Sequence, residues 1–150
     1  MENPIKLIHK FNVDAGFVTK GCNPWLESSF QVEEALEGFN LTHISKLFGS
    51  ETEDPKELSR LILGSHNKTT AVADVDVLDK ACDAVIFAVG TMSKLGLNPN
   101  QITKALNVVM QVNNLKLKAK SVDAEGKLEK PQGFVGPEEK LQAILDEVRG

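Results

Sequence analysis

Aromatic residues and cysteines are scarce in this chain, whose 150 residues include no tyrosine, one tryptophan, seven phenylalanines and two cysteines. Hydrophobic residues still make up 41% of the chain, which is enough for the core of one domain over residues 1–150. With so few aromatics, we expect that core to be aliphatic and helical. Cys22 and Cys82 lie far apart, so they argue against a disulfide framework or a zinc site and favour the reducing cytoplasm.

A basic excess and a long apolar run are also missing. The formal net charge is -4, whereas a surface that binds a nucleic-acid duplex normally shows a basic excess, so we expect no nucleic acid as a partner. The amino terminus has no secretory apolar segment. The longest apolar run, AVIFAV from Ala84, is far shorter than a membrane span, so we expect no membrane partner either.

The spacing of apolar residues predicts helices along the chain. Asp54-Pro55 predicts a capping box at the start of one helix, and Gly96 is expected to end the longest helix. Residues 118–137, which contain three glycines and Pro131, predict a turn-rich segment or a short hairpin. The expected helices span 5–14, 28 or 29 to 39, 41–48, 55–63, a long stretch between the polar loop 64–70 and Gly96, 99–118 and 137–148.

Two clusters of acidic residues lie inside apolar patterns of helical period. Residues three and four apart share one helix face, so like charges repel within each cluster and call for a counter-charge. A site made only of carboxylates suits Mg²⁺, or Mn²⁺, better than zinc. The first cluster, in the sequence EEALE, comprises Glu33, Glu34 and Glu37, and the second comprises Asp76, Asp79 and Asp83.

Each cluster also has a structural explanation, because acids in the first turns of a helix complement its dipole and most such clusters lie on solvated faces. Apolar neighbours favour the functional interpretation of the second cluster, since they predict a core helix around Asp79 and Asp83. These neighbours are Leu78, Cys82, Val85, Ile86 and Val89. The helix of the first cluster is expected to bury Phe30, Leu36 and Phe39.

Several segments, in one order along the chain, resemble the all-α nucleoside triphosphate pyrophosphohydrolases, the family related to MazG and to phosphoribosyl-ATP pyrophosphohydrolase. They are HKFNVDAG from His9, EEALE from Glu33, DKACDAVIFAVGTMSKLGL from Asp79, NNLK from Asn113 and GKLEKPQGF from Gly126. The chain is most similar to single-domain, MazG-like members. The resemblance implies a helical bundle that forms an entwined homodimer or a dimer of dimers.

The metal motifs of that family have counterparts in both acidic clusters. The first motif, EExxE, matches EEALE, which implies that its three glutamates bind Mg²⁺. The second motif, ExxD, ends at Asp83, but Lys80 stands where its first acid is expected. Asp79 returns to the same helix face, so it can supply the missing carboxylate.

The resemblance also places Asn113 and Lys116 on the phosphates of a substrate, with two lysines of a later segment, Lys127 and Lys130, closing over the same site. A lysine near a helix end is also a common partner of the helix dipole, and a basic turn is commonly solvated. Trp25 has two interpretations, a core or interface residue and a stacking surface for a base, and the sequence leaves both open.

The activity that the resemblance implies is hydrolysis of nucleoside triphosphates, with a deoxynucleotide preference, to the monophosphate and pyrophosphate. Such an enzyme cleanses the nucleotide pool. Metal ions on the carboxylates would neutralise phosphate charge and activate water, with Glu33 or Glu34 as general base. Lys80 favours an alternative, an inactive helical dimer that binds Mg-nucleotide or a protein partner.

Overall fold

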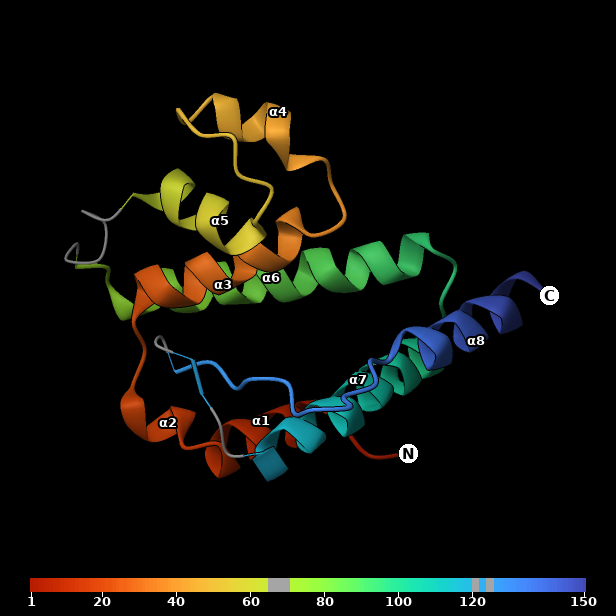
Figure 1. Ribbon diagram of the computed structural model, residues 1–150. Helices are drawn as coiled ribbons and strands as arrows, with labels where there is room; N and C mark the ends of the chain where they lie inside the picture. The colour runs from red at the N-terminus through yellow and green to blue at the C-terminus, as the bar shows by residue number, and fades with distance from the viewer. Residues whose placement is uncertain (65–70, 120–121, 124–125) are drawn as a thin grey trace. The chain divides into compact units, whose positions relative to one another are not determined.

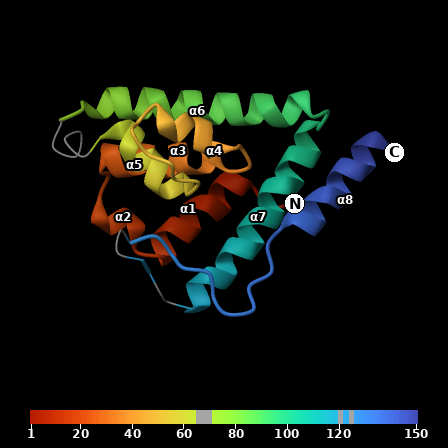
Figure 2. The same cartoon turned by 45° about the horizontal axis from the view of Figure 1, so that its top comes forward.

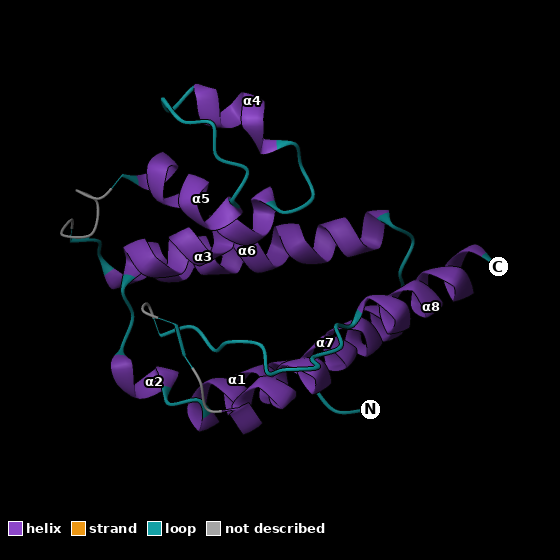
Figure 3. Cartoon of the chain, in the orientation of Figure 1, coloured by secondary structure: helices purple, strands orange, loops and turns teal. Residues whose placement is uncertain are grey.

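The computed structural model describes residues 1–64, 71–119, 122, 123 and 126–150, and in these residues it contains helices but no strand (Figure 3). The predicted all-α class is confirmed. An isolated antiparallel bridge joins Val122 and Leu128 in the segment where turns or a hairpin were expected. The predicted polar loop falls largely outside the described residues. The helices are α1 (Pro4–Asp14), α2 (Phe17–Lys20), α3 (Pro24–Leu36), α4 (Leu41–Lys46), α5 (Pro55–Leu63), α6 (Asp74–Lys94), α7 (Pro99–Ala119) and α8 (Glu138–Arg149).

The chain divides into two compact units. One unit comprises residues 21–81 and contains α3, α4 and α5, and the other comprises residues 1–20 and 82–150 and contains α1, α2, α7 and α8. Helix α6 contributes its first residues to one unit and its later residues to the other. In the described part of the chain, no helix has the length and apolar character that crossing a membrane requires.

Helix α3 begins at Pro24, and the predicted start at Ser28 or Ser29 is wrong. The Asn23 side chain accepts a hydrogen bond from the Leu26 N–H at 3.2 Å, and proline at the first helical position presets the backbone. Ser29 instead lies fully buried within the helix, and its hydroxyl donates to the Leu26 carbonyl oxygen at 2.7 Å. Pro24, which lies outside the predicted helix, is therefore in the first turn of α3.

Helix α3 also ends earlier than predicted, at Leu36 and not at Phe39. Glu37 has an extended backbone, with φ -59° and ψ 138°, and Gly38 follows with φ 84°, which glycine adopts without strain. The Asn40 side chain then caps α4. Phe39, expected in the core, is 70% exposed because it lies in the connection between the two helices.

Helix α5 has the predicted bounds and cap residue, but the reciprocal bond of the predicted capping box passes through Thr52. Asp54 N donates to Thr52 Oγ1 at 3.1 Å, and the Thr52 hydroxyl donates to Glu57 Oε2 at 2.8 Å. Asp54 Oδ1 accepts a hydrogen bond at 2.9 Å from a backbone N–H of the first turn. Helix α3 packs against α5 (Figure 1), and Leu58 is fully buried in this unit. Trp25 Nε1 donates to the Gly64 carbonyl oxygen at 2.8 Å, which ties the beginning of α3 to the end of α5.

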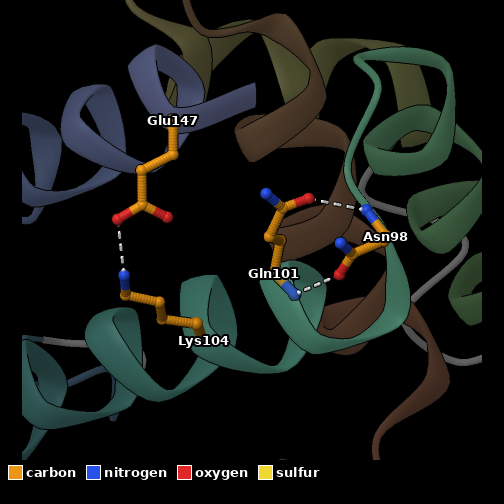
Figure 4. A network of polar contacts seen from close by, with 4 residues as sticks. All are labelled: Asn98, Gln101, Lys104 and Glu147. Carbon is orange, nitrogen blue, oxygen red and sulfur yellow. Dashed lines mark hydrogen bonds and ion pairs between the residues drawn. The ribbon is translucent and has the colours of Figure 1, made fainter. Parts of the chain in front are cut away.

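In the other unit, α7 packs against both α1 and α8 (Figure 2). Helix α7 begins at the predicted Asn98-Pro99, where Asn98 N donates to Gln101 Oε1 at 2.9 Å and Gln101 N donates to Asn98 Oδ1 at 3.0 Å (Figure 4). Lys104 Nζ lies 2.9 Å from Glu147 Oε1 and links α7 to α8 (Figure 4). The apolar face predicted for α8 is confirmed, because Ile144 joins a buried cluster of Leu97, Ile102 and Ala105, with Leu141, Leu145 and Val148 packed against it.

Helix α6 ends before Gly96, as predicted, but it is not the buried core helix that the sequence suggested. None of its residues is buried. Leu78 is 65% exposed, Val85 56% and Ile86 64%. The apolar face is therefore present in the sequence pattern, but this chain leaves it largely uncovered.

Candidate functional site

The three acids of EEALE lie at the C-terminal end of α3 in different environments. Trp25, Ser29 and Glu33 follow each other at four-residue spacing and form the buried face of the helix, with Glu33 8% exposed. Glu34 is exposed in the last turn. Glu37 is exposed just beyond it, with its N–H donating to the Glu34 carbonyl oxygen at 3.3 Å. The single helix face predicted for the three acids is therefore interrupted, because the helix ends before Glu37.

The position of these acids removes the dipole as their explanation. A helix C-terminus carries partial negative charge, so a carboxylate there is disfavoured unless a cation offsets it. The last turn of α3 contains no basic residue, whereas the favoured first turn contains Glu27. The helix dipole therefore does not account for Glu33, Glu34 and Glu37 at this end of α3.

The acids of α6 separate into two groups. Asp76 lies in the first turn, where the helix dipole favours it, so a structural role is sufficient. Asp79 and Asp83 lie further along the helix, are both exposed and return to the same face one turn apart. Lys80 is exposed next to them. Asp79 belongs to the unit of residues 21–81 and Asp83 to the other unit.

The chemistry of these candidate ligands fits a hard divalent cation, because every donor is a carboxylate oxygen. Among the residues that the structure describes, no three Asp, Glu, His or Cys side chains come together closely enough to hold a metal ion. The candidate ligands are therefore identified by their chemistry and by their positions in α3 and α6, and not by a preformed cluster.

Asn113 and Lys116 lie near the end of α7 and are both half-buried. Asn113 Nδ2 lies 3.9 Å from Met110 Sδ. Lys116 Nζ lies 5.6 Å from the centre of the Phe134 ring, and Lys130 Nζ lies 5.7 Å from the same point. The structure thus brings Lys116 and Lys130, two of the predicted substrate residues, to one aromatic side chain. Lys116 is also in the last turn of α7, where the dipole favours it.

Phe134 is a candidate that the sequence motifs do not identify. Its N–H donates to the Pro131 carbonyl oxygen at 3.1 Å, which closes a four-residue turn, and Gly133 has φ 74° in the third position of that turn. The pattern PQGF predicts a turn. It does not predict that the turn presents an aromatic ring to lysines of α7 and of the preceding segment.

A pocket of about 400 Å³ lies between this turn and the end of α7, and its lining is mostly apolar. Leu115 and Lys118 come from α7, and residues 131–135 form the rest. Lys127, another predicted substrate residue, does not line this pocket, and its N–H donates to Asp123 Oδ1 at 3.1 Å.

Trp25 lies in the core of the unit of residues 21–81. Its side chain is 8% exposed, and the Arg60 guanidinium lies 5.6 Å from the centre of its ring. The same guanidinium lies 5.8 Å from the centre of the Phe30 ring. These surroundings match the core interpretation, and they leave little of the ring for a base to stack on.

The structure thus presents two groups of candidate residues, carboxylates at the end of α3 and on α6, and lysines around Phe134 in the unit of residues 1–20 and 82–150. Comparison with known proteins gives no match to a family model, to a curated protein or to a solved structure.

Proposed function

We propose that this chain is a metal-dependent nucleoside triphosphate pyrophosphohydrolase, which releases pyrophosphate and a monophosphate and cleanses the nucleotide pool of the cytoplasm. The observation that carries the proposal is that the candidate ligands at the C-terminal end of α3 and on α6 are all carboxylates. Hard divalent ions prefer carboxylate oxygens, and the helix dipole does not account for the acids of EEALE. The resemblance of the motifs to the MazG-like family adds the reaction and a preference for deoxynucleotides.

The proposed ligands of the ion, Mg²⁺ or Mn²⁺, are carboxylates of α3 and α6. When bound, such an ion neutralises charge on the phosphates and lowers the pKa of a coordinated water. Glu34 is the better candidate for general base, since it is exposed to water whereas Glu33 is nearly buried. The full set of proposed ligands is Glu33, Glu34, Glu37, Asp79 and Asp83.

The proposed contacts to the substrate phosphates come from α7 and the segment after it. Lysine ammonium groups carry the charge that phosphates require, and an asparagine amide can donate hydrogen bonds to them. Lys116 and Lys130 already lie together at Phe134. The complete set is Asn113, Lys116, Lys127 and Lys130.

We further propose a homodimer, or a dimer of dimers, in which α6 is the contact surface. The apolar residues of α6 follow each other at alternating spacings of three and four, the pattern of helices that pack side by side in coiled coils. A continuous exposed apolar face of this kind marks an interaction site, whereas single exposed residues do not. The residues are Val75, Leu78, Cys82, Val85 and Val89, all exposed.

A second candidate function is an inactive dimer that binds Mg-nucleotide or a protein partner. Lys80 favours it, because this exposed cation sits next to Asp79 and Asp83, where the family motif has an acid. A positive charge there offsets part of the negative charge that would otherwise attract a metal ion.

The first prediction separates these two functions. We expect pyrophosphate release from at least one common or modified deoxynucleoside triphosphate in the presence of Mg²⁺ or Mn²⁺, and complete loss in excess chelator. The measurement is a coupled pyrophosphate assay across a nucleotide panel. Orthophosphate as the primary product, or full activity in chelator, would contradict the proposal, and nucleotide binding without turnover would support the inactive dimer.

The second prediction concerns the two acids beyond the first turn of α6. If Asp79 replaces the acid missing at Lys80, then Asp79→Asn and Asp83→Asn should lower kcat/KM by similar factors, about 100-fold each. Asp76→Asn is the matched control on the same helix. It should change kcat/KM by only about twofold, because the dipole accounts for Asp76.

A different outcome would reassign the site. If Asp79→Asn barely changes kcat/KM while Asp83→Asn abolishes activity, then Asp79 is a solvated acid and not a metal ligand. In that case Lys80→Glu should lower the Mg²⁺ concentration needed for half-maximal activity. If Asp79 is a ligand, Lys80→Glu should instead raise that concentration, since it adds repulsion to a filled site.

A further inference from the structure

The pocket beside the end of α7 combines three features, of which the proposed chemistry uses only the lysines at Phe134. Its lining is mostly apolar, although it opens to solvent on a chain with a net charge of -4. Phe134 forms part of its wall, held by the turn that begins at Pro131. Lys118 also lines it, and the ammonium groups of Lys116 and Lys130 lie over the Phe134 ring.

The arrangement matches a ligand that has both an aromatic ring and negative charge. The electron-rich face of a phenylalanine ring attracts ammonium groups at about 6 Å, and both lysines lie at such a distance from Phe134. A phosphate attracts an ammonium group more strongly, because it carries a full charge. Such a ligand would therefore draw the lysines from the ring and leave the aromatic face for its own ring to stack on.

We propose that this pocket binds the base of a nucleotide against Phe134, while Lys116, Lys118 and Lys130 bind its phosphate. The inference rests on the proposed function for the ligand class and adds the position of the base and the role of two residues, Phe134 and Lys118. The volume, about 400 Å³, lies within the range of small-ligand sites, roughly 300–1,000 Å³. Aromatic stacking tolerates any base, so specificity would come from neighbouring polar groups.

Binding without metal tests this inference separately from turnover. Calorimetric titration in excess chelator would use the four common deoxynucleoside monophosphates, with 2-deoxyribose 5-phosphate as the ligand that lacks a base. We expect the best monophosphate to bind about tenfold or more tightly than the sugar phosphate, as stacking of one base predicts. Equal affinity for the two, or no binding by any monophosphate, would overturn the inference.

Variants of Phe134 identify the stacking surface. Phe134→Leu should weaken binding of the monophosphate about fivefold or more, whereas Phe134→Trp should retain it. Phe39→Leu is the matched control, since Phe39 is 70% exposed in the other unit and does not line the pocket. The fluorescence of Phe134→Trp should also fall when the monophosphate binds, which tests the site even if Phe134→Leu does not fold. Unchanged fluorescence would count against stacking.

The lysine contribution is tested in the same way. Lys118→Gln should weaken binding of the monophosphate and reduce its dependence on salt, whereas Lys94→Gln, an equal charge change on α6, should do neither. If Phe134→Leu still releases pyrophosphate with an unchanged KM, the proposed role of the pocket is wrong, whereas the proposed enzymatic activity stands. If the protein binds the monophosphate only when Phe134 is present but releases no pyrophosphate, the proposed pocket is supported and the proposed enzymatic activity is contradicted.

Discussion

Glu34→Gln should lower kcat/KM for the best triphosphate by about 100-fold or more, which corresponds to about 2.7 kcal/mol of lost transition-state stabilisation. The substitution removes the charge of a proposed ligand and base but keeps its size. Glu34 is exposed at the C-terminal end of α3, where water reaches it. Steady-state kinetics measure the loss, and a thermal melt checks that the variant is folded.

The matched control for this variant is Glu51→Gln, an exposed acid in the loop before α5. It makes the same charge change in the same unit, and we expect kcat/KM to stay within about twofold of the unmodified protein. A loss of only a few-fold in Glu34→Gln would mean that Glu34 neither binds the ion nor acts as base. Glu37→Gln applies the same test to the proposed ligand that lies one residue beyond the end of α3.

Local sequence rules predicted the helices whose first residues carry an unambiguous cap. Asp54-Pro55 and Asn98-Pro99 each supply a side-chain acceptor followed by proline, and α5 and α7 begin there. Asn23-Pro24 is the same signal, yet Ser28 and Ser29 compete with it as suitable caps further along. Packing decides between them, because Ser29 is buried against other parts of its unit.

The sequence predicted which residue types form the candidate site, but it predicted their burial and contacts only in part. The position of EEALE on a helix follows from the apolar period, but the burial of Glu33 depends on how α3 packs against α5. Phe134 depends on a turn that brings it to Lys116 on α7, a contact between segments that no local pattern encodes. The periodicity of a sequence gives no information on long-range contacts of this kind.

Helix α6 shows the limit of periodicity most clearly. The pattern correctly predicts a helix with one apolar face, and it gives no information on whether the same chain or another chain covers that face. Leu78, Val85 and Ile86 are exposed by more than half. The acids Asp79 and Asp83 are therefore beside an uncovered apolar face, and not beside the core that their neighbours suggested.

The last prediction concerns that face. Val85→Glu should convert the proposed dimer into monomers at micromolar concentration, with the dissociation constant raised about 100-fold or more. In a symmetric dimer both copies of Val85 lie in the contact. Each buried aliphatic side chain contributes roughly 1.5–3 kcal/mol to the free energy of association. A buried glutamate adds a desolvation cost. Sedimentation velocity over a concentration series measures the change.

Val13→Glu on α1 is the matched control, since Val13 is 49% exposed and lies outside α6. It should leave the dissociation constant unchanged. An unmodified protein that sediments as a stable, active monomer would contradict the dimer, and a Val85→Glu protein that remains dimeric would move the contact to another surface. If the monomer of Val85→Glu stays folded and loses activity, the site needs the partner. If it keeps full activity, the proposed carboxylates act within one chain and the apolar face of α6 serves assembly alone.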